Sequence, residues 1–72
     1  MTQAAKVLIR RARANDGTLN LAAVAANAPA PVQALRGMLD TANAIPAGIA
    51  YVQSNVLVLT ANPAEIAIIL GE

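Results

Sequence analysis

The sequence predicts an α+β fold for one small domain, with three helices, a β-hairpin and a short C-terminal helix. One observation behind this class is a helical spacing of apolar residues, clearest in segments 2–14 and 31–43. The other is a pair of short β-type runs, 49–52 and 56–59, on either side of turn-forming residues. A chain of 72 residues cannot support two hydrophobic cores, so we expect residues 1–72 to form a single domain.

The first helix is expected over Thr2–Ala14, with Thr2 as its N-cap. Its apolar residues recur at the spacing of one helical face, and four of the five basic residues of the chain lie on other faces of the same segment. The apolar residues are Ala5, Leu8, Ile9 and Ala12, and the basic residues are Lys6, Arg10, Arg11 and Arg13. Asn15, Asp16 and Gly17 favour a turn that ends this helix.

A second helix is predicted over Leu19–Ala28, with apolar residues on nearly every side. Pro29 and Pro31 end it, because proline lacks the N–H group that a helix interior needs. The third helix is predicted to begin at or near Pro31 and to end at Asn43. Its buried stripe would be Val32, Leu35, Leu39 and Ala42, and its outward residues would be Gln33, Arg36, Asp40 and Asn43.

The hairpin is predicted from strands Ile49–Val52 and Val56–Leu59, joined by Gln53, Ser54 and Asn55. A C-terminal helix would follow, with Asn62 as N-cap, Pro63 in the first position, Glu65 two residues later, and Gly71 as its end. The alternative is a third strand over Glu65–Leu70, since three isoleucines in this short run are β-branched.

Composition indicates a protein that associates with itself. The hydrophobic share is 57% and the charged share is 12%, about half of the ~25% that is usual in soluble domains. The net charge of +1 provides little repulsion between copies, so we expect a homo-oligomer. A small domain without cysteine is typical of a reducing compartment, and we expect a cytoplasmic protein.

No catalytic, cofactor or metal motif is present in the sequence. Cysteine and histidine are absent, which removes thiol nucleophiles, imidazole bases and most zinc ligands. The carboxylates are Asp16, Asp40, Glu65 and Glu72, and no pair has a diagnostic spacing. No apolar run approaches the ~20 residues of a membrane-spanning helix. We therefore expect no enzyme activity, no cofactor, no metal, no small-molecule substrate and no membrane partner.

The order of elements from Thr18 to Leu59 resembles a winged helix-turn-helix domain. Leu19–Ala25 is similar to the supporting helix of regulators of the multiple-antibiotic-resistance and catabolite-activator types, and Ala30–Leu39 is similar to their recognition helix. The predicted hairpin takes the place of the wing. This resemblance, which rests on layout and apolar pattern, implies that the helix 31–43 reads duplex DNA.

The resemblance implies roles for six polar residues. Gln33 and Arg36 would reach base edges in the major groove. Four residues of the first helix would contact phosphates. These four are Lys6, Arg10, Arg11 and Arg13. The alternative is that both sets are solvated helix faces, since a pI of about 8.3 and an uncharged wing tip favour DNA only weakly. The basic stripe could also contact acidic lipid.

Two functional hypotheses follow. The first is a small DNA-binding protein, a phage or bacterial regulator of transcription or an assembly factor, that acts as a homo-oligomer. The second is a non-enzymatic structural or protein-interaction module of a virion or other multisubunit assembly, with Ile66 and Ile69 in a subunit contact.

Overall fold

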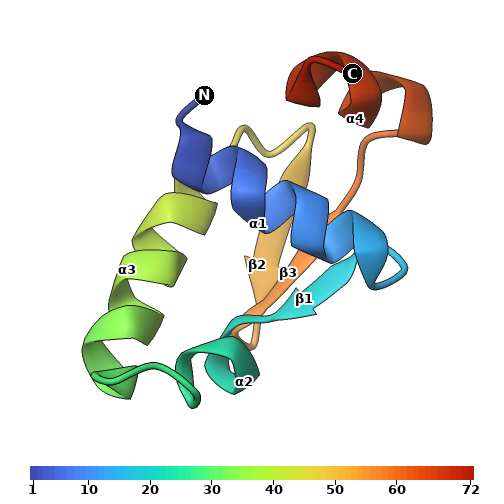
Figure 1. Cartoon of the computed structure of the whole chain (residues 1–72). Helices are drawn as coiled ribbons and strands as arrows, with labels where there is room; N and C mark the ends of the chain where they lie inside the picture. Colours follow the sequence, from blue (N-terminus) through green and yellow to red (C-terminus); the bar gives the residue numbers. More distant parts are fainter.

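The computed structural model describes all residues from Met1 to Glu72. Four helices and a three-stranded antiparallel sheet make an α+β fold with a small winged-helix-like layout (Figure 1). The elements are α1 Gln3–Ala14, β1 Thr18–Asn20, α2 Leu21–Ala25, α3 Pro31–Asn43, β2 Ala50–Gln53, β3 Val56–Leu59 and α4 Pro63–Leu70. The strand order is β1-β3-β2, so β3 is the central strand. None of the helices has the length and apolar character needed to cross a lipid bilayer.

Capping side chains mark the starts of α1 and α4. The Thr2 hydroxyl accepts a hydrogen bond from the Ala5 N–H at 3.1 Å, and the Asn62 side chain accepts one from the Glu65 N–H at 2.9 Å. Gly71 ends α4 in the left-handed conformation, with φ of 77°. The alternative of a third strand over residues 65–70 is therefore wrong, because this segment has caps at both ends and forms a helix.

Strand β1 was not predicted. Its residues pair with the central strand in the register Thr18 with Val58, Leu19 with Leu57 and Asn20 with Val56. The Asn20 side chain accepts a hydrogen bond from the Ala23 N–H at 3.1 Å and so begins α2 one residue after the strand. The prediction of a helix over residues 19–28 was thus wrong at both ends, because sheet pairing takes its first residues and α2 ends at Ala25.

The core lies between α1 and the sheet, and α2, α3 and α4 each contribute buried apolar residues to it. Helix α1 packs on β1 and β3, and α3 packs on α2 and β2 (Figure 1). The predicted apolar face of α1 is buried throughout. On α3 only Ala42 is buried, whereas Leu35 and Leu39 are half-buried. The prediction that Val32 belongs to the buried stripe was wrong, since this side chain is 82% exposed.

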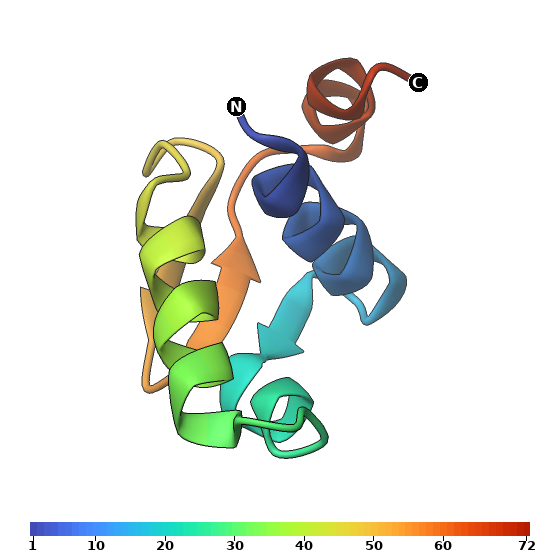
Figure 2. The ribbon, with the colours of Figure 1, turned by 60° about the vertical axis from the view of Figure 1, so that its left-hand side comes forward.

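The hairpin turn and the first turn of α3 lie at the same end of the molecule. Helix α4 lies at the opposite end, and a rotation about the vertical axis leaves this arrangement unchanged (Figures 1 and 2). The turn is tight, because Ser54 and Asn55 both have positive φ, at 52° and 64°, and connect the strands directly. Gln53, predicted in the turn, is the last residue of β2.

Candidate nucleic-acid interface

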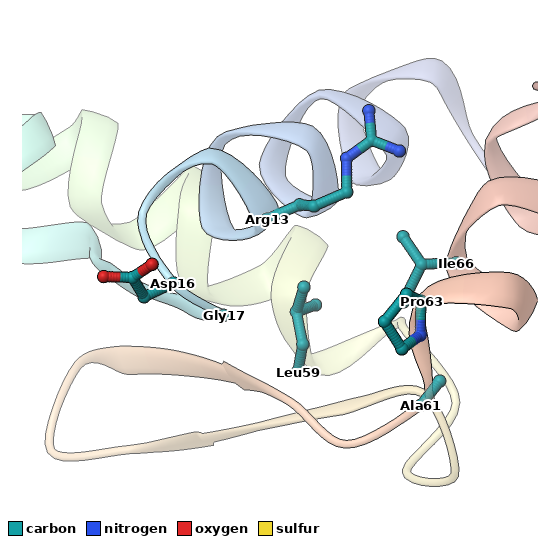
Figure 3. A pocket seen from close by; sticks show the side chains of 7 residues that line it. All are labelled: Arg13, Asp16, Gly17, Leu59, Ala61, Pro63 and Ile66. Atoms are coloured by element: carbon teal, nitrogen blue, oxygen red, sulfur yellow. The ribbon is translucent and has the colours of Figure 1, made fainter.

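Two open hollows interrupt the surface. The larger, of about 270 Å³, lies between the turn after α1 and the start of α4, with Asp16, Leu59 and Pro63 in its lining (Figure 3). The smaller, of about 240 Å³, follows the outer edge of β2 beside Tyr51. Both are smaller than the roughly 300–1,000 Å³ of most ligand pockets. Of the residues predicted to contact DNA, only Arg13 lines a hollow, and the others lie on helix surfaces.

The N-terminal half of α3 presents an open polar face. Helix α3 begins at Pro31, whose missing N–H costs nothing in the first position, and its N-cap Ala30 makes no side-chain hydrogen bond. Gln33 and Arg36 are both exposed and are three residues apart, so the structure brings them together on one helix face. Both side chains are directed away from the core, as the sequence predicted.

Arg36 has an intrahelical partner that leaves most of its guanidinium free. Its Nε lies 3.3 Å from Oδ1 of Asp40, one turn further along the exposed face. The two Nη atoms have no partner within the chain. An arginine uses two N–H donors side by side to bind a carboxylate, a phosphate or the edge of a guanine. Asp40 thus pairs with Nε alone and leaves these two donors available.

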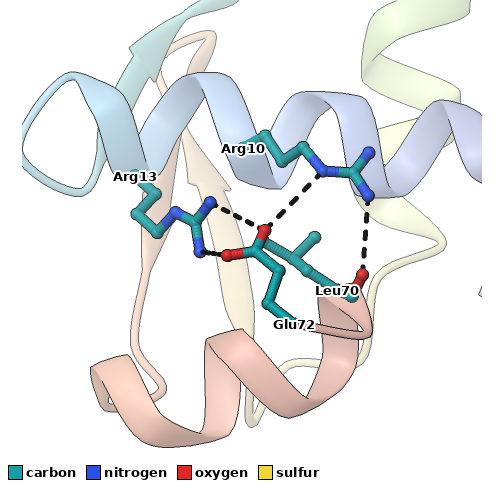
Figure 4. Close-up of polar contacts among 4 residues, drawn as sticks. All are labelled: Arg10, Arg13, Leu70 and Glu72. Atoms are coloured by element: carbon teal, nitrogen blue, oxygen red, sulfur yellow. Dashed lines mark hydrogen bonds and ion pairs between the residues drawn. The ribbon is translucent and has the colours of Figure 1, made fainter.

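The four basic residues of α1 do not form one continuous basic surface that is free to bind a ligand. Arg13 donates two hydrogen bonds to the Glu72 carboxylate, from Nη1 at 2.7 Å and from Nη2 at 2.9 Å (Figure 4). Arg10 lies 4.0 Å from the same carboxylate through Nε and donates to the Leu70 carbonyl at 3.5 Å. These contacts hold the end of α4 against α1. Two of the four predicted phosphate contacts therefore already have an intramolecular partner.

The paired charges shift the ionisation of both partners. The hydrogen bond from Arg13 lowers the pKa of Glu72, and the charges of Arg13 and Arg10 lower it further, while desolvation opposes the shift. The hydrogen bond to Glu72 raises the pKa of Arg13, again against desolvation. Both side chains are partly exposed to water, so the pair is screened and stabilises the α1–α4 contact modestly.

Lys6 and Arg11 are the basic residues with no carboxylate within 4.0 Å. A helix turns about 100° per residue, so Lys6 lies on the same side of α1 as Arg10 and Arg13, the side that contacts α4. Arg11 lies about 100° from Arg10 and about 160° from Arg13. It is exposed and forms a separate basic point on the surface of α1.

The hairpin is too short to project far as a wing. Strand β1 pairs with β3 up to Val56, which is the first residue after the turn. The Leu21 N–H then donates to the Asn55 carbonyl at 2.9 Å, which ties the turn to the start of α2. The turn carries Ser54 and Asn55 and no charge. Any contact that it makes with a polyanion therefore depends on hydrogen bonds.

Sequence reasoning missed two features of the α3 face. The sequence predicts Asp40 on the outward side but not its pairing with Arg36, for which the spacing of four residues is the signal. Val32 was predicted in the core, and no local signal marks it as exposed, because it continues the apolar spacing of α3.

Comparisons with protein-family models, with curated proteins and with solved structures found no match for this chain.

Proposed function

We propose that this protein binds duplex DNA with the N-terminal half of α3, as a phage or bacterial regulator or assembly factor in the cytoplasm. The observation that carries the proposal is the pair of free Nη donors on Arg36, which pairs with Asp40 through Nε and lies near Gln33 on an open helix face. The N-terminal half of α3 lies at the same end of the molecule as the hairpin turn (Figure 2). The winged-helix-like layout supports the same orientation.

The chemistry of the two polar residues suits the major groove. The groove is about 12 Å wide, and a helix with its side chains is about 10–12 Å across. Arg36 would donate both Nη groups to O6 and N7 of a guanine, and Gln33 would bind the N6 and N7 edge of an adenine. Each such pair distinguishes the right base from the wrong one by about 1–3 kcal/mol.

Phosphate contacts would be few in each copy. Arg11 is the basic residue of α1 that is unpaired and turned from the α4 side, whereas Arg10 and Arg13 are held by Glu72. Lys6 shares the face of α1 that contacts α4. Because affinity for DNA depends strongly on neutralised phosphates, one copy would bind weakly. Self-association would supply a second set of contacts, and we propose that the DNA-binding form is a homo-oligomer.

The test compares two arginine variants on a selected duplex and on a scrambled duplex at two salt concentrations. Arg36→Ala should lose about 1–3 kcal/mol on the selected duplex and relax sequence preference, because a base contact is lost. Arg11→Ala is the matched control and should weaken binding to both duplexes equally, because a phosphate contact carries no sequence information. If wild type binds neither duplex at low salt, or if Arg36→Ala keeps both affinity and preference, the proposal fails.

A second function is favoured by two exposed apolar residues away from α3. Ile68 on α4 is 76% exposed, and Tyr51 on the edge strand β2 is 44% exposed. Only 12% of the residues of the chain are charged, so its surface offers little electrostatic repulsion to a protein partner at these side chains. A protein-interaction module of a larger assembly is therefore the competing proposal, and loss of self-association after substitution of Ile68 would support it.

A further inference from the structure

Val32 is the most exposed large apolar side chain of the chain. It is 82% exposed, compared with 47% for Val7, the exposed valine of α1. It contributes almost nothing to the core. Valine is also a poor choice for helix formation, because its branched side chain loses rotamer freedom in a helix. Neither burial nor helix propensity explains an apolar residue here.

The position of Val32 places it on the exposed face of α3 that also carries Arg36. It lies one helical turn before Arg36 and next to Gln33 in the first turn of α3. At about 100° per residue, Val32 and Arg36 are about 40° apart around the helix. The Cβ atoms of residues four apart on a helix are about 5–6 Å from each other. Val32 therefore belongs to the face that holds the free donors of Arg36.

We propose that Val32 reads the C5 methyl group of a thymine in the major groove, which rests on the proposed function. That methyl is the apolar group that a thymine presents on its major-groove edge, and small apolar side chains contact it. Successive bases are about 3.4 Å apart along a strand. We therefore expect the thymine within a few base-pair steps of the guanine that Arg36 contacts. The proposed site would combine one apolar contact with the two polar ones.

The experiment removes the thymine methyl group from the DNA and, separately, shortens the Val32 side chain of the protein. A preferred duplex is selected with the wild-type protein, and each thymine is then replaced in turn by deoxyuridine, which lacks only the methyl. Wild type should lose roughly fourfold in affinity at one position, which is the effect of removing one buried methyl-sized group. Val32→Ala should show a smaller loss than wild type at that position, because its shorter side chain makes less contact with the methyl.

Val7→Ala is the control, because it shortens an exposed valine on α1 and should respond to deoxyuridine as wild type does. Alanine favours helix more than valine, so both variants should fold, which circular dichroism checks. If no thymine matters, or if Val32→Ala loses affinity on deoxyuridine as wild type does, the inference is overturned. The proposed function then still stands on duplex binding and the Arg36 effect. If no duplex binds at low salt, both are overturned.

Discussion

The carboxylate of Glu72 limits how far two arginines of α1 are available to bind a ligand. It accepts hydrogen bonds from Arg13 and lies within ion-pair distance of Arg10, so that the last turn of α4 is held against α1. A nucleic-acid phosphate would have to displace this carboxylate to bind both Nη groups of Arg13, whereas Arg10 approaches the carboxylate only through Nε, at 4.0 Å. Sequence reasoning could not foresee the contact, because Arg13 and Glu72 are 59 residues apart and no local pattern links them.

The lowered pKa of Glu72 makes the α1–α4 contact sensitive to acid. A carboxyl whose pKa is lower in the folded state stabilises that state above its unfolded pKa, near 4.5, and this stabilisation is lost as pH falls through the folded pKa. Hydrogen exchange of the α4 amides should therefore quicken below pH 4.5 in wild type, relative to its rate at pH 6 after correction for intrinsic exchange. Glu72→Gln should lack this step, since an amide does not titrate. Glu65→Gln is the control, and an acid step retained in Glu72→Gln would contradict the assignment.

Asp40 should influence sequence discrimination more than stability. An exposed ion pair four residues apart on a helix contributes about 0.3–0.5 kcal/mol, so Asp40→Asn should change the free energy of unfolding by no more than that. The same change removes a negative charge near the proposed DNA face and frees Arg36 to move. Binding to a scrambled duplex should therefore become tighter, while the ratio of selected to scrambled affinity falls. An unchanged ratio would mean that Asp40 does not position Arg36.

At the scale of single elements, local signals predicted the starts of α1, α3 and α4 and the buried face of α1, but not the bounds of α2 or the exposed side of α3. The caps Thr2 and Asn62 and the prolines at the starts of α3 and α4 act within a few residues, and the structure confirms them. Strand β1 has three residues, and its pairing with β3 joins segments almost 40 positions apart. A segment that short carries no periodicity of its own, so the apolar pattern of residues 19–28 predicts a helix there instead.

Helix α4 is the element whose buried side is hardest to predict from the sequence. Its apolar residues occur on all sides, so the sequence could not decide which isoleucine packs inward. The expectation that Ile66 lies in a subunit contact was wrong, because this residue is 2% exposed and belongs to the core of its own chain. Ile69 is half-buried, and Ile68 is the residue that α4 presents to solvent.

Substitutions on α4 should therefore separate folding from self-association. Ile66→Asp should destabilise the fold by more than about 3 kcal/mol, because it removes core packing and places a charge in the interior. Ile68→Asp should change the free energy of unfolding by about 0.5 kcal/mol or less. Urea unfolding measures both effects. If copies associate through α4, light scattering will detect smaller particles for Ile68→Asp than for wild type, and an unchanged mass will exclude this surface as the contact.

At the scale of the whole molecule, the charges are divided between two ends. The arginines that Glu72 binds lie with α4, and the proposed reading face of α3 lies at the opposite end with the hairpin turn (Figures 1 and 4). The four basic residues of α1 were predicted from the sequence to contact phosphate together. Helical spacing placed them on one element correctly, but only tertiary packing determines which end of the molecule each one faces.

The salt dependence of DNA binding tests which of these basic residues contact phosphate. The logarithm of the affinity falls with the logarithm of salt concentration by about 0.9 for each phosphate contact. With Arg11 as the main contact in each copy, Arg11→Ala should reduce this slope by about 1 for each copy bound. Glu72→Gln should leave the slope unchanged, although it releases Arg10 and Arg13, because those arginines lie at the α4 end. A steeper slope in Glu72→Gln would mean that DNA approaches α1 from the α4 side, and α3 would then not be the reading helix.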